Sequence, residues 1–101
     1  MGGACLDANT TGYDNCAVGQ AALGEATTAH SNTAMGRTSL HLTTTGNSNT
    51  GFGFKTLYSN TTGVLNTAVG ASALLDSTTG QYNAAVGAYA GADITTGSFN
   101  C

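Results

Sequence analysis

Polar and apolar positions along this chain return every 17 residues, so that equivalent positions of successive repeats form columns. In each unit a large apolar residue and a glycine follow an asparagine. A leucine stands four positions after that glycine, except in the last unit, where Gly91 takes its place. A Thr-Thr-Gly run closes most units, as in 66–80. A strict short period of this kind determines the architecture more strongly than local propensity does. The asparagine column contains Asn15, Asn32, Asn49, Asn66, Asn83 and Asn100.

The period predicts an all-β fold. It is too short for helical hairpin repeats, which need about 33 residues or more, and paired threonines with several glycines disfavour helix. Short strands separated by Gly and Asn turns fit better, with a strand near columns 15–18 and a second near columns 21–25. We therefore expect a β-solenoid, or parallel β-roll, that forms a single domain over 1–101. Its six expected coils are 1–17, 18–34, 35–51, 52–68, 69–85 and 86–101.

Two neighbouring columns of the first strand are both constrained in size. Adjacent strand residues face opposite sides, so we expect the large apolar column to point into its own coil with the leucines. We expect the small column to pack against a partner chain. One coil offers too few large apolar residues for a stable core, which favours an oligomer, most simply a parallel trimer; a two-sheet monomer is the alternative. The large column is Val18, Met35, Phe52, Val69 and Val86, and the small column is Ala17, Ala34, Gly51, Ala68 and Ala85.

The asparagine column is expected to form a structural ladder. Stacked amides bond to each other and to the turn backbone in stacked parallel strands. The threonine columns suit β-branched packing and hydroxyl-to-backbone bonds at the turn.

Charge is scarce, at 7% of residues with a net charge of −3. With only two basic residues, the chain has no positively charged surface for nucleic acid. The sequence contains no apolar run of 18 residues, so we expect no membrane insertion. His30 and His41 stand in unrelated columns, and no Ser/His/Asp or Cys/His constellation is in a plausible place. We expect no enzyme, no metal and no cofactor.

The unit at 66–70, with 73–74 and 77–80, resembles the NTAVG-x-x-AL-x-x-x-TTG repeats of bacteriophage tail fibres and bacterial surface fibres. It is more distantly similar to the head repeats of trimeric autotransporter adhesins, whose period is shorter. The first resemblance covers nearly the whole chain. It implies a non-enzymatic, self-associating fibre or filament, extracellular or on a virion, that serves in attachment to a cell-surface glycan or receptor.

The alternative is a surface-binding β-solenoid that binds a glycan or ice through an exposed threonine or aromatic face. An ice-binding array needs threonines at i and i+2, whereas Thr10 and Thr11 are adjacent and face opposite ways. Exposed aromatic and basic residues are expected in the variable columns: Tyr13, His30, Arg37, Phe54, Lys55, Tyr58, Tyr82, Tyr89 and Phe99.

Cysteines suggest how chains join. Cys16 and Cys101 share a column but lie five coils apart, about 24 Å, which is too far for a bridge within one chain. If a second chain stacks head to tail, its Cys16 lies about 4.8 Å from Cys101, which a disulfide accepts. The other interpretation is that these residues and Cys5 are ordinary thiols in small columns. Asn9 and Asn60 begin N-glycosylation sequons.

Overall fold

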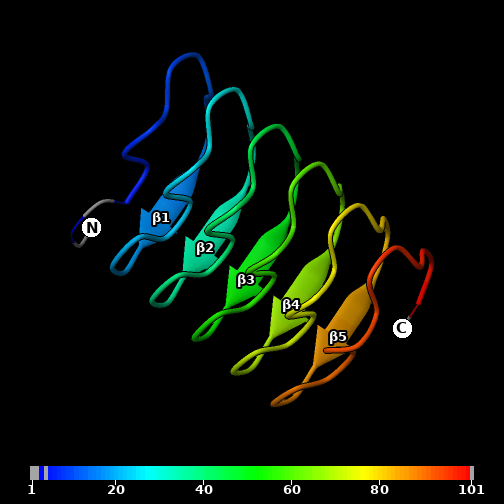
Figure 1. The fold of residues 1–101 in the computed structure, drawn as a ribbon. Coiled ribbons are helices and arrows are strands. Elements are labelled where there is room, and N and C mark those ends of the chain that lie inside the picture. The colour runs from blue at the N-terminus through cyan, green and yellow to red at the C-terminus, as the bar shows by residue number, and fades with distance from the viewer. Residues whose placement is uncertain (1–2, 4, 101) are drawn as a thin grey trace.

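The computed structural model describes residues 3 and 5–100 and shows a β-solenoid with the termini at opposite ends (Figure 1). Its dimensions are 30 × 20 × 16 Å. Five parallel strands form one sheet in chain order, and each residue pairs with its equivalent one period later, as Ala34 does with Gly51. The prediction of an all-β solenoid with stacked strands near columns 15–18 is confirmed. The strands are β1 (Cys16–Val18), β2 (Thr33–Met35), β3 (Thr50–Phe52), β4 (Thr67–Val69) and β5 (Ala84–Val86).

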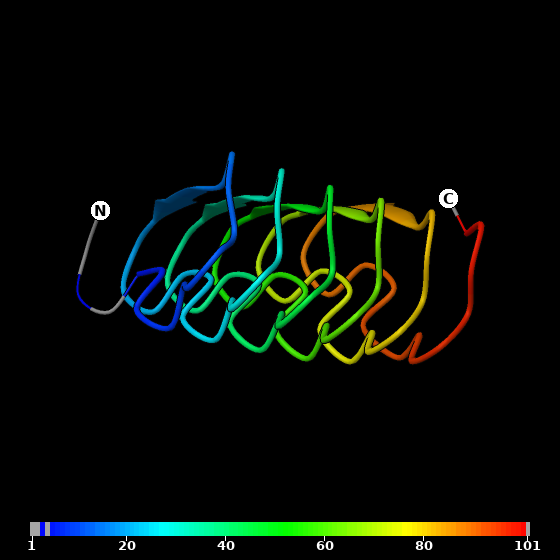
Figure 2. The same cartoon turned by 90° about the horizontal axis from the view of Figure 1, so that it is seen from above.

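After each strand the chain folds back through consecutive turns (Figure 2). In the coil after β1, Ala22 N–H donates to Gly19 O and Ala26 N–H donates to Leu23 O, both at 3.2 Å. Leu23 itself has φ 50°, which is left-handed and incompatible with an extended strand. The prediction of a second strand near columns 21–25 is therefore wrong. The turns still stack, because Leu23 N–H donates to Ser39 O of the next coil at 3.0 Å.

Left-handed backbone recurs at the same columns of successive coils. Among the described residues, sixteen that are not glycine have positive φ, a conformation that is uncommon outside glycine. In the coil after β3 these residues are Lys55, Leu57 and Leu65. The glycine after each strand is more constrained still: Gly19 has φ 124°, and a Cβ there would lie 2.7 Å from the carbonyl carbon of Gly36. These glycines let successive coils approach closely.

The interior is filled by the leucine stack, the small column and the asparagines. Leu23, Leu40 and Leu57 are fully buried. The small column also faces inward, since Ala34 and Ala68 have no exposed surface. The expectation that the small column packs against a partner chain is thus wrong for all five residues, because each is buried in its own coil. They are Ala17, Ala34, Gly51, Ala68 and Ala85.

The geometry around Gly51 explains why the small column lies inside. A Cβ on Gly51 would lie 2.6 Å from Ser39 Oγ and 2.7 Å from Thr56 Oγ1. These hydroxyls belong to the column across the interior and lie 2.6 Å from each other. Only a small residue fits opposite them, so the neighbouring large apolar column lies on the outer face. Its predicted place in the core is also wrong: Val18, Met35, Phe52, Val69 and Val86 are exposed or half-buried.

Candidate functional site

The outer face of the sheet carries no charge. The first and third residues of each strand point outward and the central residue is buried. Parallel pairing places the third residues of all five strands in one row and the first residues in another. The row of first residues contains Cys16, Thr33, Thr50, Thr67 and Ala84. The row of third residues, called here the apolar row, contains Val18, Met35, Phe52, Val69 and Val86.

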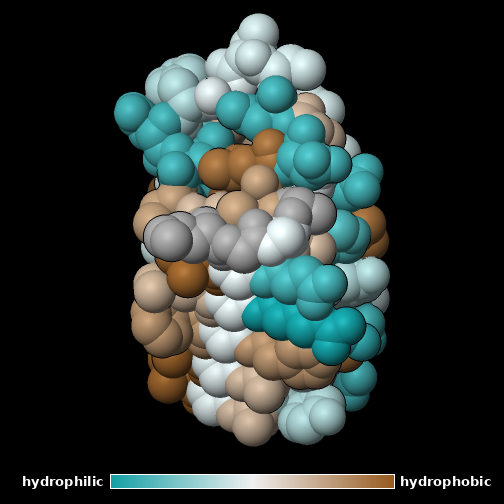
Figure 3. All heavy atoms as spheres, turned by 90° about the vertical axis from the view of Figure 1, so that its left-hand side faces the viewer, coloured by the Kyte–Doolittle hydropathy of each residue, from teal (hydrophilic) through white to brown (hydrophobic). Residues whose placement is uncertain are grey.

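The apolar row is accessible along its length. Phe52 is 51% exposed, Val18 and Val69 are each 36% exposed, and Val86 is 76% exposed. Equivalent residues in neighbouring strands are about 4.8 Å apart, so the side chains of the apolar row form a continuous stripe across the sheet. In Figure 3 apolar surface gathers beside a narrow column of near-neutral surface. A contiguous exposed apolar surface of this kind is typical of an interaction site.

The asparagines form a hydrogen-bonded ladder beside the sheet. Asn66 N–H and Nδ2 donate to Asn49 Oδ1 at 3.0 and 3.1 Å, and Nδ2 also donates to Gly80 O at 2.8 Å. Asn66 Oδ1 in turn accepts from Asn83 N–H and Nδ2 at 3.0 and 3.1 Å. The structure places all six predicted asparagines in this stack, from Asn15 to Asn100. The ladder fixes the backbone just before each strand and therefore holds the outer face in register.

Threonines add a second set of bonds between coils. Thr27 Oγ1 donates to Thr44 O at 3.3 Å, and Thr44 Oγ1 donates to Thr61 O at 3.4 Å. These hydroxyls donate to the next coil, one period later, whereas the asparagine amides donate to the preceding coil. The Thr-Thr-Gly turns therefore stabilise the contact between coils rather than only the turn itself.

The predicted disulfide residues lie on different parts of the chain. Cys16 is the first residue of β1 and presents a free, exposed thiol on the outer face. Cys101 lies outside the described residues. Cys5 is half-buried and packs against the core.

The two sequons differ in accessibility. Asn9 is exposed and its Nδ2 donates to Gly12 O at 3.2 Å. Asn60 is fully buried, and its Nδ2 donates to Thr43 Oγ1 and Gly63 O, both at 3.3 Å. The prediction of glycosylation at Asn60 is wrong for the folded chain, because its amide is inside the solenoid. Glycosylation at Asn9 stays a prediction.

Ring stacking between coils escaped the sequence interpretation. Tyr13 stacks on His30 with 4.7 Å between ring centroids, and Tyr82 stacks on Phe99 at 4.9 Å. The members of each pair are one period apart, and this spacing is the signal that would have found them. Stacked rings between coils add rigidity to the outer surface.

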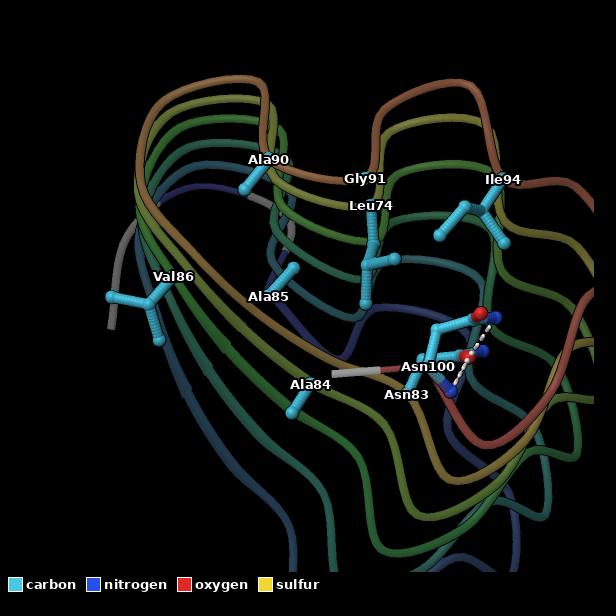
Figure 4. Close-up of a pocket in the computed structure, with 9 residues that line it drawn as sticks. All are labelled: Leu74, Asn83, Ala84, Ala85, Val86, Ala90, Gly91, Ile94 and Asn100. Carbon is cyan, nitrogen blue, oxygen red and sulfur yellow. Dashed lines mark hydrogen bonds between the residues drawn. The ribbon is translucent and has the colours of Figure 1, made fainter.

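A hollow of about 190 Å³ lies in the last described coil (Figure 4). Gly91 stands there in the leucine column, so the space above Leu74 lacks a side chain. Ile94 partly compensates, since its Cδ1 would lie 3.3 Å from a Cβ on Gly91. Alanines, Val86 and the Asn83–Asn100 amide pair, bonded at 2.9 Å, form the rest of the lining. Among the described residues, no acidic, basic or thiol side chain lines this hollow.

Within residues 3 and 5–100, no three His, Cys, Asp or Glu side chains gather closely enough to hold a metal ion. The described part of the chain also contains no helix that could cross a membrane. Comparison with protein-family models, with characterised proteins and with solved structures finds no match. The surface that stands out is therefore the uncharged outer face of the sheet with its apolar row.

Proposed function

We propose that this chain is a non-enzymatic structural protein, a rigid solenoid of six 17-residue coils that self-associates into a fibre. The observation that carries the proposal is the exposed, uncharged apolar row across β1–β5. The resemblance of the repeat unit at 66–80 to tail-fibre repeats supports an extracellular or virion-borne fibre that serves in attachment.

A second copy of the chain is the partner that fits this face best. Both copies carry the same spacing of about 4.8 Å along the stack, so each row can meet an equivalent row at every strand. The two longer dimensions of the molecule, 30 and 20 Å, limit any one face to about 600 Å² per chain, or about 1,200 Å² per pair, at the low end of stable interfaces. In a parallel trimer three such faces surround one axis and remove the apolar rows from water.

Hydrophobic burial provides the driving force. Phe52 and Val69 together keep a large part of their side chains in water in the single chain. Burying this remaining area contributes on the order of 1 kcal/mol per side chain. Because the row has no charged member, association requires no desolvation of an ion.

End-to-end stacking is a second part of the proposal. The asparagine ladder is directional: within the described chain Asn15 N–H has no acceptor and Asn100 Oδ1 has no donor. These two groups complement each other between stacked copies. In the presence of oxidised glutathione, the Cys101 thiol and the next chain's Cys16 thiol would exchange into one disulfide, with glutathione reduced. Non-reducing gels should show multimers that Cys16→Ser abolishes; a single monomer band for the unmodified chain would reject this part.

Lateral association is tested by replacing two members of the apolar row, Phe52 and Val69, with threonine, which preserves strand propensity. Analytical ultracentrifugation of the full chain should show association weakened by at least about tenfold. Leu65→Asn is the matched control, because Leu65 is 47% exposed, lies in the bend before β4 rather than on the strand, and has a φ of 57°, which asparagine tolerates. Unchanged association of the folded Phe52→Thr/Val69→Thr variant would overturn the proposal.

A further inference from the structure

The only two basic residues of the chain lie side by side. Arg37 follows β2 and Lys55 follows β3, in neighbouring loops at the ends of the strand arrows (Figure 1). Lys55 N–H donates to Arg37 O at 3.1 Å, which fixes the two loops against each other. Neither side chain forms an ion pair within residues 3 and 5–100. Both cations are therefore available to a ligand.

Aromatic rings surround the ammonium group of Lys55. Its Nζ lies 5.5 Å from the centroid of the Phe54 ring and 5.6 Å from that of the Tyr58 ring. Phe54 is 44% exposed, so part of its ring remains accessible next to the positive charge. A cation near two rings is attracted to the electron-rich faces of both.

The Tyr58 ring packs against a side chain of the preceding coil. His41 stacks on it with 5.6 Å between centroids and 21° between planes, and His41 Nδ1 donates to Ala21 O at 2.9 Å. Gly24 makes room for the imidazole, because a Cβ there would lie 2.9 Å from it. The rings are thus pre-positioned by the stacked coils. We call Arg37, His41, Phe54, Lys55 and Tyr58 the basic aromatic patch.

The patch contrasts in charge with the rest of the molecule. The chain has a net charge of −3, yet both of its positive charges are concentrated here. Glu25 is the nearby acid along the backbone, since its N–H donates to His41 O at 3.0 Å. It forms no ion pair with Arg37 or Lys55. An anion that approaches this surface is therefore directed to the patch.

We propose that the basic aromatic patch binds an acidic saccharide, a sugar that carries a carboxylate or sulfate group. Arg37 and Lys55 supply charge-assisted hydrogen bonds to the anionic group. The Phe54 and Tyr58 rings supply flat apolar surface for a sugar ring. Two cations are too few to follow a nucleic-acid backbone. This saccharide site would be the means of attachment, and in this point the proposal rests on the proposed function.

Binding is measured by surface plasmon resonance with the full chain immobilised. The probes are 3′-sialyllactose for the carboxylate, a heparin-derived hexasaccharide for the sulfate, neutral lactose, and sodium sulfate. At least one acidic saccharide should bind at least about tenfold more tightly than lactose and sodium sulfate, since both charge and ring contacts contribute. Equal binding of sodium sulfate would show a simple anion site, and equal binding of lactose would show that charge is irrelevant; each result overturns the proposal.

Variants separate the contributions of charge and ring. Arg37→Gln/Lys55→Gln should weaken the acidic saccharide by at least about tenfold, and Tyr58→Leu, which retains both charges, should weaken it severalfold. Tyr82→Leu, which removes a ring from a different stacked pair, should leave binding unchanged. Wild-type binding by the charge variant or by Tyr58→Leu would refute the site.

The same variants distinguish this inference from self-association. Arg37→Gln/Lys55→Gln should sediment as the unmodified chain does, whereas Phe52→Thr/Val69→Thr should lose association but retain saccharide binding per chain. If the charge variant loses association as well, the patch belongs to the chain–chain contact and the saccharide assignment is wrong. If the Phe52→Thr/Val69→Thr variant associates as the unmodified chain does while the charge variant behaves as expected, the fibre proposal falls and the saccharide site stands.

Discussion

Removing one internal asparagine should destabilise the solenoid far more than removing the last one. Asn66→Ala leaves two buried backbone groups without a partner. Asn83 N–H loses Asn66 Oδ1, its acceptor at 3.0 Å, and Gly80 O loses the Nδ2 donor at 2.8 Å. Each buried unsatisfied group costs about 1–3 kcal/mol, so the free energy of unfolding should fall by about 2–6 kcal/mol.

Asn100→Ala is the matched control at the end of the ladder. Asn100 is exposed, and its Nδ2 makes one bond, to Asn83 Oδ1 at 2.9 Å. Its backbone N–H keeps the same acceptor after substitution. The expected loss is about 0.5–1.5 kcal/mol, the net value of one hydrogen bond. Asn66→Asp, which keeps the acceptor but turns the donor into an oxygen facing Gly80 O, should cost at least as much as Asn66→Ala.

The assay is urea unfolding followed by far-ultraviolet circular dichroism at one fixed chain concentration, because association also affects apparent stability. Hydrogen exchange provides a local measurement, in which the Asn83 amide should exchange faster in Asn66→Ala. If Asn66→Ala and Asn100→Ala lower the free energy of unfolding equally, the ladder does not carry the stability assigned to it.

Three further substitutions test the interior and the turns. Gly51→Ala should lower the free energy of unfolding by about 1–3 kcal/mol through overpacking, although alanine occupies the other described positions of this column. Truncating Ser39 and Thr56 to alanine in the same chain should restore most of this loss. If the truncation restores no stability, the inward placement of residue 51 is contradicted. Leu57→Ala should cost about 2–5 kcal/mol by removing a fully buried side chain, and a urea midpoint within error of the unmodified chain would refute the leucine stack. Ser48→Gly should add about 0.5–1 kcal/mol, because Ser48 is exposed with φ 59° and glycine adopts that conformation without a Cβ clash; a lower midpoint would count against this account of the turn.

The stacking of the coils was predictable because it depends only on the period. Identical columns pair when each coil repeats the length of the last, so Ala34 meets Gly51 and Gly51 meets Ala68. The amides of Asn49 and Asn66 fall in one stack for the same reason. Neither result depends on which side of the strand faces inward.

The direction of the side chains was not predictable from hydrophobicity. Valine is more often buried than exposed, yet Val69 points outward and Ala68 inward. The width of the interior decides this, because the leucine stack and the asparagine ladder leave space only for a small residue. A signal was present: Gly51 is the glycine of the alanine column, and it faces the bulkier Ser39 and Thr56.

The second strand was wrongly predicted because leucine carries no mark of left-handed backbone. Leu57 has φ 48°, a conformation that usually selects glycine or asparagine. Here its side chain is fully buried, and its N–H donates to Ala73 O at 3.0 Å. Packing and hydrogen bonding between coils outweigh the local preference, and both depend on neighbours that a single repeat does not contain.

Each ladder bond joins residues one period apart, and this determines which duplications and insertions the chain can accept during evolution. From Asn32 onward, each asparagine of the ladder bonds to the asparagine of the preceding coil. Duplication or loss of a whole unit by recombination between repeats would therefore rejoin Asn49 to another asparagine with every column still aligned. Insertion of one residue would instead make one coil longer than its neighbours and break the alignment of columns at that coil. The length of the rod is thus free to vary in whole coils, while its cross-section is fixed.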